Sequence, residues 1–423
     1  MSPVFLLLLM IAVLITGVFR LRWPTGVSLA VAALLGALAA GYGIPVRHLV
    51  EGTMLYLDPI LIVVTSLFFM RAYEQSGSLA ELNNWMLRTF GRSPVLLIIV
   101  LTLFVMFPGM LTGLTAPCVL TTGAMSIPIL LAAGLSRPRA AAFIAVAAFF
   151  GMVAPPVNIC AMIIGSGVDM PYVGFGLPLS IAAFPLAFAS SFWLMRGHVS
   201  GLSAASREQL GRDANRVRLA AFAPLALLLL LLFGARWFPG VIPDFGVPLL
   251  FVLATAVAAL TGRRVNLLQS LDRAVRDGIP ILGLLAGIGI FIQILTLTGA
   301  RGEIVVNTLI MPPWLRDATI AVLVPLFGGV SAYGSSSVLG VPLLLAMLER
   351  SDIMIAAALS LLASVGDFLP PTRLAVVLAG QVTSESNPNS ILRHCWTPAV
   401  AAVLWGLLMI WFANPLAKLL GLS

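Results

Sequence analysis

The segment Gly151-Met-Val-Ala-Pro-Pro-Val-Asn-Ile-Cys-Ala-Met-Ile-Ile-Gly165 has a counterpart in Gly366-Asp-Phe-Leu-Pro-Pro-Thr-Arg-Leu-Ala-Val-Val-Leu-Ala-Gly380. In both segments a Pro-Pro pair begins four residues after one glycine, and a second glycine closes the segment. Each lies in a run that is apolar enough for a membrane helix. Two consecutive prolines, however, remove two backbone donors and push the preceding residue out of the α region. We therefore predict that a helix breaks at each Pro-Pro pair.

Each break must lie where other groups can form hydrogen bonds with the backbone that it exposes. An unpaired carbonyl or N–H group in hydrocarbon costs several kcal/mol, so such a break persists only against protein or a polar cavity. Two matched breaks in the two halves of one chain are typical of a transporter's binding site. The similarity extends further, because Ile127-Pro-Ile-Leu-Leu131 resembles Val341-Pro-Leu-Leu-Leu345 at nearly the same offset. The shared offset indicates that the two halves of the chain are repeats of each other.

The composition places the chain in a membrane. Hydrophobic residues make up 60% of it and charged residues 9%, and its mean hydropathy is +1.07. No soluble core needs that much apolar surface. The net charge of +8 comes from arginines scattered singly between apolar runs, which is typical of topology signals rather than of a nucleic-acid surface. The three cysteines have no metal-binding spacing, and we interpret them as small core residues.

We predict an all-α polytopic membrane protein built from two inverted-topology repeats. The first repeat covers residues 1–195, with a re-entrant hairpin at about 94–135 and a broken helix at about 140–168. The second covers 219–423, with a hairpin at about 318–348 and a broken helix at about 353–383. Residues 196–218 form a linker rich in arginine, serine and glycine. Ordinary spans are expected near 4–19, 25–43, 55–73, 172–195, 219–238, 246–261, 278–298 and 396–416.

The first hairpin is inferred from the junction between its two apolar runs. Residues 112–117 join these runs without a charge, and Pro108, Gly109, Gly113 and Pro117 crowd the junction. A short uncharged turn between two apolar arms favours a re-entrant hairpin over two separate spans. The tip of the second hairpin is the stretch Gly328-Gly-Val-Ser-Ala-Tyr-Gly-Ser-Ser-Ser337.

The arginines predict the orientation. With the amino terminus outside, most basic residues fall on the inner side, including the five arginines of the linker. Those that fall outside are Arg47, Arg236, Arg301, Arg316, Arg350 and Lys418. The first half then starts outside and the second starts inside, as an inverted repeat requires. The amino terminus is thus predicted to be periplasmic and the linker cytoplasmic.

These features resemble the large membrane subunit of TRAP (tripartite ATP-independent periplasmic) transporters, in the ion-transporter superfamily. Thr112-Gly113, Gly123 and Ile127-Pro128 match the spacing of that family's first hairpin segment. Residues 151–158 resemble its Gly-x-x-x-Pro-Pro-Ser pattern, and Leu57-Asp58-Pro59 is similar to its third span. The resemblance covers nearly the whole chain.

The resemblance implies an elevator-type secondary transporter in the bacterial inner membrane. Such a protein takes an organic acid, for example a dicarboxylate, from a periplasmic binding protein and is driven by sodium. A small four-helix membrane subunit is the implied partner, expected as a separate chain. Sodium is the expected coupling ion, and neither a cofactor nor a transition-metal site is expected. The alternative is a stand-alone ion-coupled symporter or antiporter of the same superfamily.

Oxygen atoms at the tips and breaks are the candidate ligands. The amino end of a half-helix suits a carboxylate, whereas hydroxyls and free carbonyls suit an alkali cation. Ion-binding candidates are Thr112, Gly113, Thr121, Thr122, Pro155, Ser337, Asp367 and Pro370. Substrate-binding candidates are Arg373, Asn158, Thr115, Ser335 and Ser336. The competing interpretation is that the hydroxyls only hydrogen-bond to neighbouring helices.

Asp367 and Arg373 are oppositely charged residues inside one predicted span, on either side of the Pro-Pro pair. An ionised group in mid-membrane costs roughly 2.5–3.5 kcal/mol even on insertion scales, so each must face a cavity or the other. In one interpretation Arg373 binds a substrate carboxylate with its planar guanidinium, and Asp367 orients it or takes part in coupling. In the other, the two form a structural ion pair.

Other functional classes fit the sequence poorly. An intramembrane serine hydrolase would need a general base at membrane depth, but His48, His198 and His394 fall in loops or at span ends. The chain has neither a P-loop for an ATP-driven pump nor an H-E-x-x-H motif. A channel is possible, but inverted broken-helix repeats favour alternating access.

The orientation predicts how a cysteine placed in the linker reacts. In a variant with Ser206→Cys, an impermeant maleimide added to the periplasmic side should not label the new cysteine, because the linker is predicted to be cytoplasmic. Permeabilised cells should show full labelling. Labelling from the periplasmic side in intact spheroplasts would contradict the predicted topology.

Overall fold

The computed structural model describes residues 2–91, 93–197, 219–237, 243, 245–262 and 265–422. Nearly all of the predicted linker at 196–218 lies outside these ranges. Within them the chain consists of helices and connecting turns, without a strand. Six helices are long and apolar enough to cross a membrane, and the number rises to seven if one bent helix pair counts as a span. The prediction of an all-helical polytopic membrane protein is confirmed.

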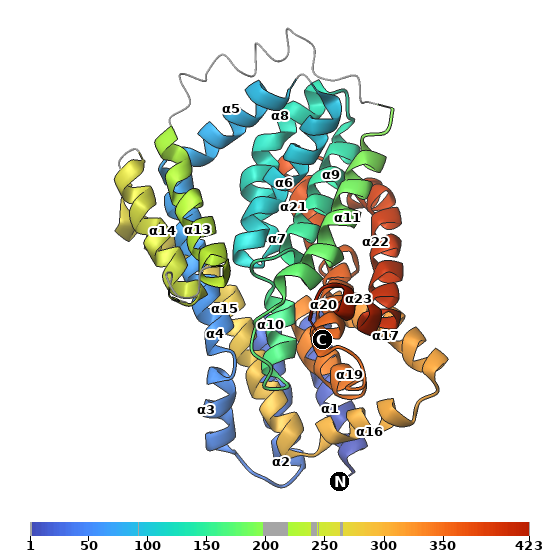
Figure 1. Cartoon of the computed structure of the whole chain (residues 1–423). Helices are drawn as coiled ribbons and strands as arrows, with labels where there is room; N and C mark the ends of the chain where they lie inside the picture. Colours follow the sequence, from blue (N-terminus) through green and yellow to red (C-terminus); the bar gives the residue numbers. More distant parts are fainter. Residues whose placement is uncertain are drawn as a thin grey trace.

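The first set of helices is organised around α15 (Leu267–Leu297), and we call it the α15 group. It lies at the left and bottom of Figure 1. Its other members are α1 (Pro3–Ile15), η1 (Thr16–Arg20), α2 (Thr25–Ala39), α3 (Val46–Met54), α4 (Leu57–Gln75), α13 (Ala223–Trp237), α14 (Val247–Thr261) and α16 (Ala300–Ile310). A half-buried arginine, Arg71 on α4, lies 2.6 Å from Asp277 on α15 and 2.8 Å from Glu74. The pair with Asp277 joins α4 to the first part of α15, whereas the pair with Glu74 lies within α4.

Glycines let α15 pack so closely on α2 and α3 that the helix backbones are in direct contact. A Cβ atom on Gly287 would lie 2.2 Å from the Gly26 carbonyl oxygen, and one on Gly289 would lie 2.0 Å from that of Gly52. Helices in a membrane associate through such small residues, because lipid provides no hydrophobic drive for their association.

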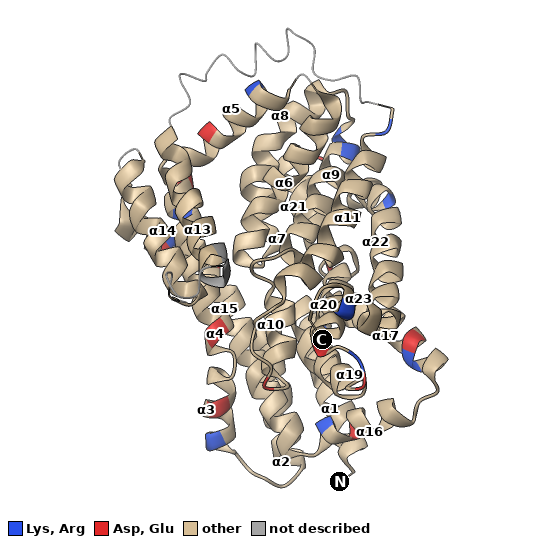
Figure 2. Ribbon diagram, viewed as in Figure 1, with Lys and Arg blue, Asp and Glu red and all other residues tan. Residues whose placement is uncertain are grey.

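The second set surrounds the buried helices α9 (Arg137–Val153) and α20 (Asp352–Ser364), and we call it the α9 group. Its members from the first half are α6 (Pro94–Thr112), α7 (Thr115–Cys118), η2 (Val119–Gly123), α8 (Ala124–Ala132), α10 (Ile159–Ser166) and α11 (Gly176–Leu194). Those from the second half are α17 (Pro313–Gly328), α18 (Ala332–Ser335), η4 (Ser336–Gly340), α19 (Val341–Leu345), η5 (Val365–Phe368), α21 (Leu374–Thr383), α22 (Pro388–Trp411) and α23 (Ala413–Leu419). Figure 2 shows that charged residues are sparse along the long helices of this group.

Both predicted helix breaks are present at the Pro-Pro pairs. Helix α9 ends at Val153 and the chain resumes as α10 at Ile159, whereas η5 ends at Phe368 and α21 begins at Leu374. Both Pro-Pro peptide bonds are cis. Asn158 caps α10, its side chain accepting a hydrogen bond from the Ala161 amide at 2.9 Å.

Each predicted hairpin consists of two helical arms joined by a short tip. In the first, α6 ends at Thr112, and Gly113 turns the chain with a φ of +67° before α7 begins. In the second, α17 ends at Gly328 and α18 begins at Ala332. The first hairpin contacts α5 (Ser78–Phe90) and the second contacts α16, which lie at opposite ends of the molecule (Figure 1).

Several helices were not predicted, or begin earlier than expected. Helices α3, α5 and α16 carry too many polar residues to register as apolar runs. Helix α15 begins at Leu267 rather than near 278, because the Asn266 side chain caps it and its first turns are charged. Helix α22 begins at Pro388 rather than near 396, since Pro388 occupies its first turn and the Asn387 side chain accepts the Asn389 amide.

Two buried or half-buried hydrogen bonds connect the α15 group to the α9 group. The Tyr56 hydroxyl, at the elbow between α3 and α4, lies 2.8 Å from the Ser337 hydroxyl in η4. The Arg301 guanidinium in α16 donates to the Gly167 carbonyl oxygen at 2.5 Å. In the described ranges these two hydrogen bonds join the groups, and apolar side chains of both groups pack into one continuous core.

A substitution at Gly366 tests the packing of the second break. Its added Cβ atom would lie 1.9 Å from the Gly328 carbonyl carbon, so Gly366→Ala should destabilise the protein by about 1–3 kcal/mol. The matched control is Gly302→Ala in α16, where a Cβ meets nothing within 4 Å. The control should leave the melting temperature unchanged or raise it slightly, because alanine favours helix. Equal melting temperatures for the two purified variants would contradict this packing.

Candidate functional site

Side chains from both hairpin tips and both breaks meet at Asp367. We call the set Thr115, Met152, Cys160, Tyr333 and Asp367 the central cluster. Thr115 comes from the first tip and Tyr333 from the second, Met152 and Cys160 flank the first break, and Asp367 precedes the second. Segments that are more than two hundred residues apart in sequence, such as Thr115 and Asp367, therefore build one polar site.

The closest contact in the central cluster joins Thr115 to Asp367. The Thr115 hydroxyl oxygen lies 2.5 Å from Asp367 Oδ2 and 3.1 Å from the Met152 sulfur. The exposed fraction is 2% for Thr115 and 6% for Asp367, so the carboxyl is nearly removed from solvent. Within the described ranges, Thr115 is the only hydrogen-bond partner of this carboxyl group.

Tyr333 connects the two hairpin tips. Its hydroxyl donates to the Gly113 carbonyl oxygen at 3.1 Å and lies 3.9 Å from the Met152 sulfur. The Gly113 carbonyl belongs to the turn that follows α6, where the helix leaves its last carbonyls without intrahelical partners. Tyr333 thus satisfies one exposed carbonyl of the first tip from the opposite half of the chain.

The two breaks are held to their own hairpins by matching backbone hydrogen bonds. The Val157 amide, just after the first Pro-Pro pair, donates to the Met110 carbonyl at 3.1 Å. The Thr372 amide, just after the second pair, donates to the Gly329 carbonyl at 3.3 Å. Each bond joins the residue after a Pro-Pro pair to the end of the preceding hairpin arm.

Asn158 joins the first break to the second half. Its amide nitrogen donates to the Val153 carbonyl at 2.9 Å and to the Ser360 hydroxyl at 3.0 Å. Both of its amide hydrogens are therefore used within the protein, and its carbonyl oxygen caps α10. A ligand can reach Asn158 only through the remaining lone pair of that oxygen.

Five of the other predicted hydroxyl ligands donate their hydrogens to nearby backbone carbonyls, whereas Ser337 contacts the Tyr56 hydroxyl at 2.8 Å. Thr112 donates to Pro108 at 2.8 Å, Thr121 to Pro117 at 2.6 Å and Ser336 to Ala332 at 2.9 Å, each within its own helix or tip. Thr122 lies 3.2 Å from both the Cys118 and Val105 carbonyls, and Ser335 donates to Val324 at 2.7 Å. Their oxygens keep lone pairs that can accept a hydrogen bond or coordinate a cation.

Arg373 does not join the central cluster. Its backbone is left-handed, with a φ of +43°, and its guanidinium donates to the Asn389 side chain at 3.1 Å. No salt bridge between Arg373 and Asp367 occurs in the described part of the chain. The Arg373 Nε atom is buried without a hydrogen-bond partner there. Pro155 is partly buried, whereas Pro370 is exposed.

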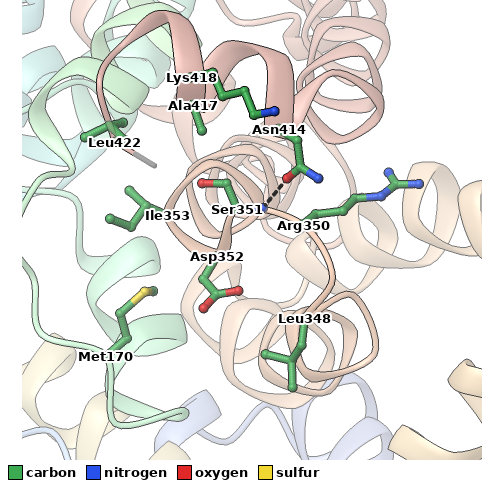
Figure 3. A pocket seen from close by; sticks show the side chains of 10 residues that line it. All are labelled: Met170, Leu348, Arg350, Ser351, Asp352, Ile353, Asn414, Ala417, Lys418 and Leu422. Atoms are coloured by element: carbon green, nitrogen blue, oxygen red, sulfur yellow. Dashed lines mark hydrogen bonds between the residues drawn. The ribbon is translucent and has the colours of Figure 1, made fainter.

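Two cavities lie outside the central cluster. The larger, of about 620 Å³, separates α1 from the second hairpin and reaches Pro370 and Pro371, and its lining is mostly apolar. The smaller, of about 450 Å³, lies between the start of α20 and α23 (Figure 3). Its lining includes Arg350, Asp352 and Lys418. None of the residues that line this smaller cavity belongs to the central cluster.

Sequence reasoning missed several residues of the site. Met152 was not singled out, and Cys160 was interpreted as a core residue. The available signal was position, because Met152 and Cys160 lie within about one helical turn of the Pro-Pro pair. Tyr333 lies at the predicted second tip, but the sequence alone gave no partner for its hydroxyl.

Two hairpins and two broken helices that meet at one polar cluster inside apolar helices define a membrane transport protein of the broken-helix type. Residues 4–415 match the family described as "Tripartite ATP-independent periplasmic transporter, DctM component". The chain belongs to this family and is a large component of a TRAP-type secondary transporter. The resemblance stated from sequence is confirmed.

A solved structure is similar over most of the chain. It is described as "Crystal structure of the Alcanivorax borkumensis YdaH transporter reveals an unusual topology". The TM-score is 0.60, and the alignment covers 86% of this chain and 87% of that one at 17% identity. At this identity the likeness concerns the fold alone. A comparison with curated protein sequences finds no match.

Proposed function

We propose that the chain is the permease subunit of a TRAP transporter that takes up an organic acid, such as a dicarboxylate, across the bacterial inner membrane. Uptake is coupled to sodium, and the substrate is delivered by a periplasmic binding protein. A small four-helix membrane subunit completes the complex, and the amino terminus is periplasmic. The observation that carries the proposal is the family match over residues 4–415.

The arrangement of the two helical groups supports an elevator mechanism. Both tips and both breaks belong to the α9 group, whereas α15 and its glycine contacts belong to the α15 group. Movement of the α9 group as one body would carry the whole site past the α15 group. This movement must break the hydrogen bonds of Tyr56 with Ser337 and of Arg301 with Gly167.

The tips and breaks supply oxygen ligands of the kind that sodium accepts. In the first half we propose Thr112, Gly113, Thr121, Thr122 and Pro155 as ion ligands, through hydroxyl or backbone oxygens. In the second half we propose Ser337, Asp367 and Pro370. The support for this proposal is chemical, because hydroxyl and carbonyl oxygens at helix breaks are suitable ligands for an alkali cation.

For the substrate carboxylate we propose Thr115, Asn158, Ser335, Ser336 and Arg373. The unpartnered Nε atom of Arg373 supports its inclusion, since a guanidinium that keeps a free N–H can still bind a carboxylate. The half-helix amino ends at Ile159 and Leu374 add the positive end of a helix dipole to each break.

Uptake by the purified complex tests the proposed function. Proteoliposomes containing this chain and its small subunit should accumulate a ¹⁴C-labelled C4-dicarboxylate or sugar acid when an inward sodium gradient and the binding protein are both present. Replacing sodium with potassium, or omitting the binding protein, should abolish accumulation. Equal uptake without the binding protein would instead favour the stand-alone symporter or antiporter.

Variants of Arg373 probe the carboxylate site in the same assay. Arg373→Lys should lose most uptake, because a point charge cannot reproduce the bidentate geometry of a guanidinium, and Arg373→Ala should lose more. Combining Arg373→Ala with Asp367→Ala should not restore uptake, since the two side chains form no ion pair. Near-normal uptake by the double variant would show that Arg373 acts only as the structural partner of Asp367.

A further inference from the structure

We propose that Tyr56 and Arg301 determine how much of the protein has its α9 group in the position described here. Tyr56 bonds to Ser337 and Arg301 to Gly167, and we call this pair of hydrogen bonds the latch. The inference rests on the elevator movement of the proposed function. It adds that two residues outside the transport site control the equilibrium between the end positions of that movement.

The first argument is the contrast between the latch and the rest of the boundary. Apolar side chains of both groups pack into one continuous core. Apolar contact has no direction, so one set of apolar neighbours can replace another when the groups slide past each other. A hydrogen bond, in contrast, weakens steeply with distance and angle. In the described part of the chain, the latch is therefore the polar contact that a shifted position cannot keep.

The residues of the latch that belong to the α15 group are held by α15 itself. Tyr56 follows α3, whose Gly52 packs directly on Gly289 of α15. Arg301 lies at the start of α16, which begins shortly after α15 ends. The Arg301 guanidinium is close enough to Tyr56 to interact with it electrostatically. Both side chains thus lie at one place on a common support.

Their partners in the α9 group also belong to one packed unit. Ser337 lies in η4, and Gly167 follows α10 directly. A Cβ atom on Gly167 would lie 2.4 Å from the side chain of Val341, the residue after η4, so the end of α10 contacts the second hairpin closely. When the α9 group moves as one body, both bonds of the latch must therefore break together.

The same unit carries part of the transport site. Ser337 comes directly after Ser335 and Ser336 at the second tip. Helix α10 extends from its cap, Asn158 at the first break, to Gly167. When the latch is formed, the second tip and the first break are thus held near the α15 group, and the site can change its position only after both bonds have opened.

Burial and charge strengthen the latch. The exposed fraction is 1% for Tyr56 and 0% for Ser337, so water does not compete for their bond. Arg301 places its positive charge at the carboxyl end of α10, where the helix dipole favours a cation. The loss of one neutral hydrogen bond shifts an equilibrium by about two- to tenfold, and the loss of one to a charged group by about tenfold or more.

Pulsed electron paramagnetic resonance on the full chain in lipid tests the proposal. Spin labels are attached to Leu268→Cys on α15 and Leu419→Cys on α23, two exposed positions, after the three native cysteines are changed to alanine. The main distance in this parent should be that of the position described here. Tyr56→Phe should lower the population ratio of this position to the other by about two- to tenfold, and Arg301→Met by about tenfold or more. The double variant should shift the ratio further.

Two control variants remove matched bonds that do not join the two groups. Tyr73→Phe removes the bond from the buried Tyr73 hydroxyl to the Ala221 carbonyl in η3 (Leu219–Phe222), the segment before α13. Arg350→Met removes the bond from the half-buried Arg350 guanidinium to the Ile410 carbonyl, within the α9 group. Both controls should keep the distance distribution of the parent.

Distance distributions that match the parent in both single variants and in the double variant would overturn the proposal. Equal shifts in the variants and their controls would overturn it too, since the effect would then come from a general loss of stability. Failure of sodium-driven uptake alongside the expected shifts would instead refute the proposed function and leave the latch in place. The two failures are therefore distinguishable.

Discussion

The structure depends on how the backbone groups are hydrogen-bonded at the two places where a membrane helix breaks. A Pro-Pro break leaves carbonyl groups before it and amide groups after it without intrahelical partners, and lipid cannot provide any. The protein places a hairpin beside each break, so that the amides of Val157 and Thr372 bond to Met110 and Gly329 in the preceding arms. This requirement holds each hairpin against its own break, and the close approach of Gly366 to Gly328 is part of the same arrangement.

Once each break is paired with its hairpin, the two halves can share one site. Tyr333 of the second tip bonds to Gly113 of the first, Thr115 of the first tip bonds to Asp367 of the second break, and Asn158 bonds to Ser360. Each of these contacts joins the two halves of the chain. The site therefore exists only when both halves are folded against each other.

The sequence predicted the breaks because proline chemistry is local, and the hairpins because short uncharged turns between apolar arms have few alternatives. It predicted the partner of neither charged residue. Asp367 and Arg373 are six residues apart in sequence, yet Asp367 bonds to Thr115 and Arg373 to Asn389. Such pairings depend on tertiary contacts between distant segments, as do the roles of Met152 and Tyr333. Helices α3, α5 and α16 were missed because their polar faces interrupt the apolar pattern.

The central claim is that the two breaks meet at one site, and a cross-link between the halves tests it most directly. The Ser364 hydroxyl lies 3.9 Å from the Cys160 sulfur. In a chain with Cys118→Ala, Cys395→Ala and a protease site inserted within 198–218, Ser364→Cys should form an oxidant- or mercury-induced cross-link with Cys160. After proteolysis the two halves should then migrate as one band under non-reducing conditions, whereas the parent with only Cys160 should give two. Two separate bands from the Ser364→Cys chain would contradict the account.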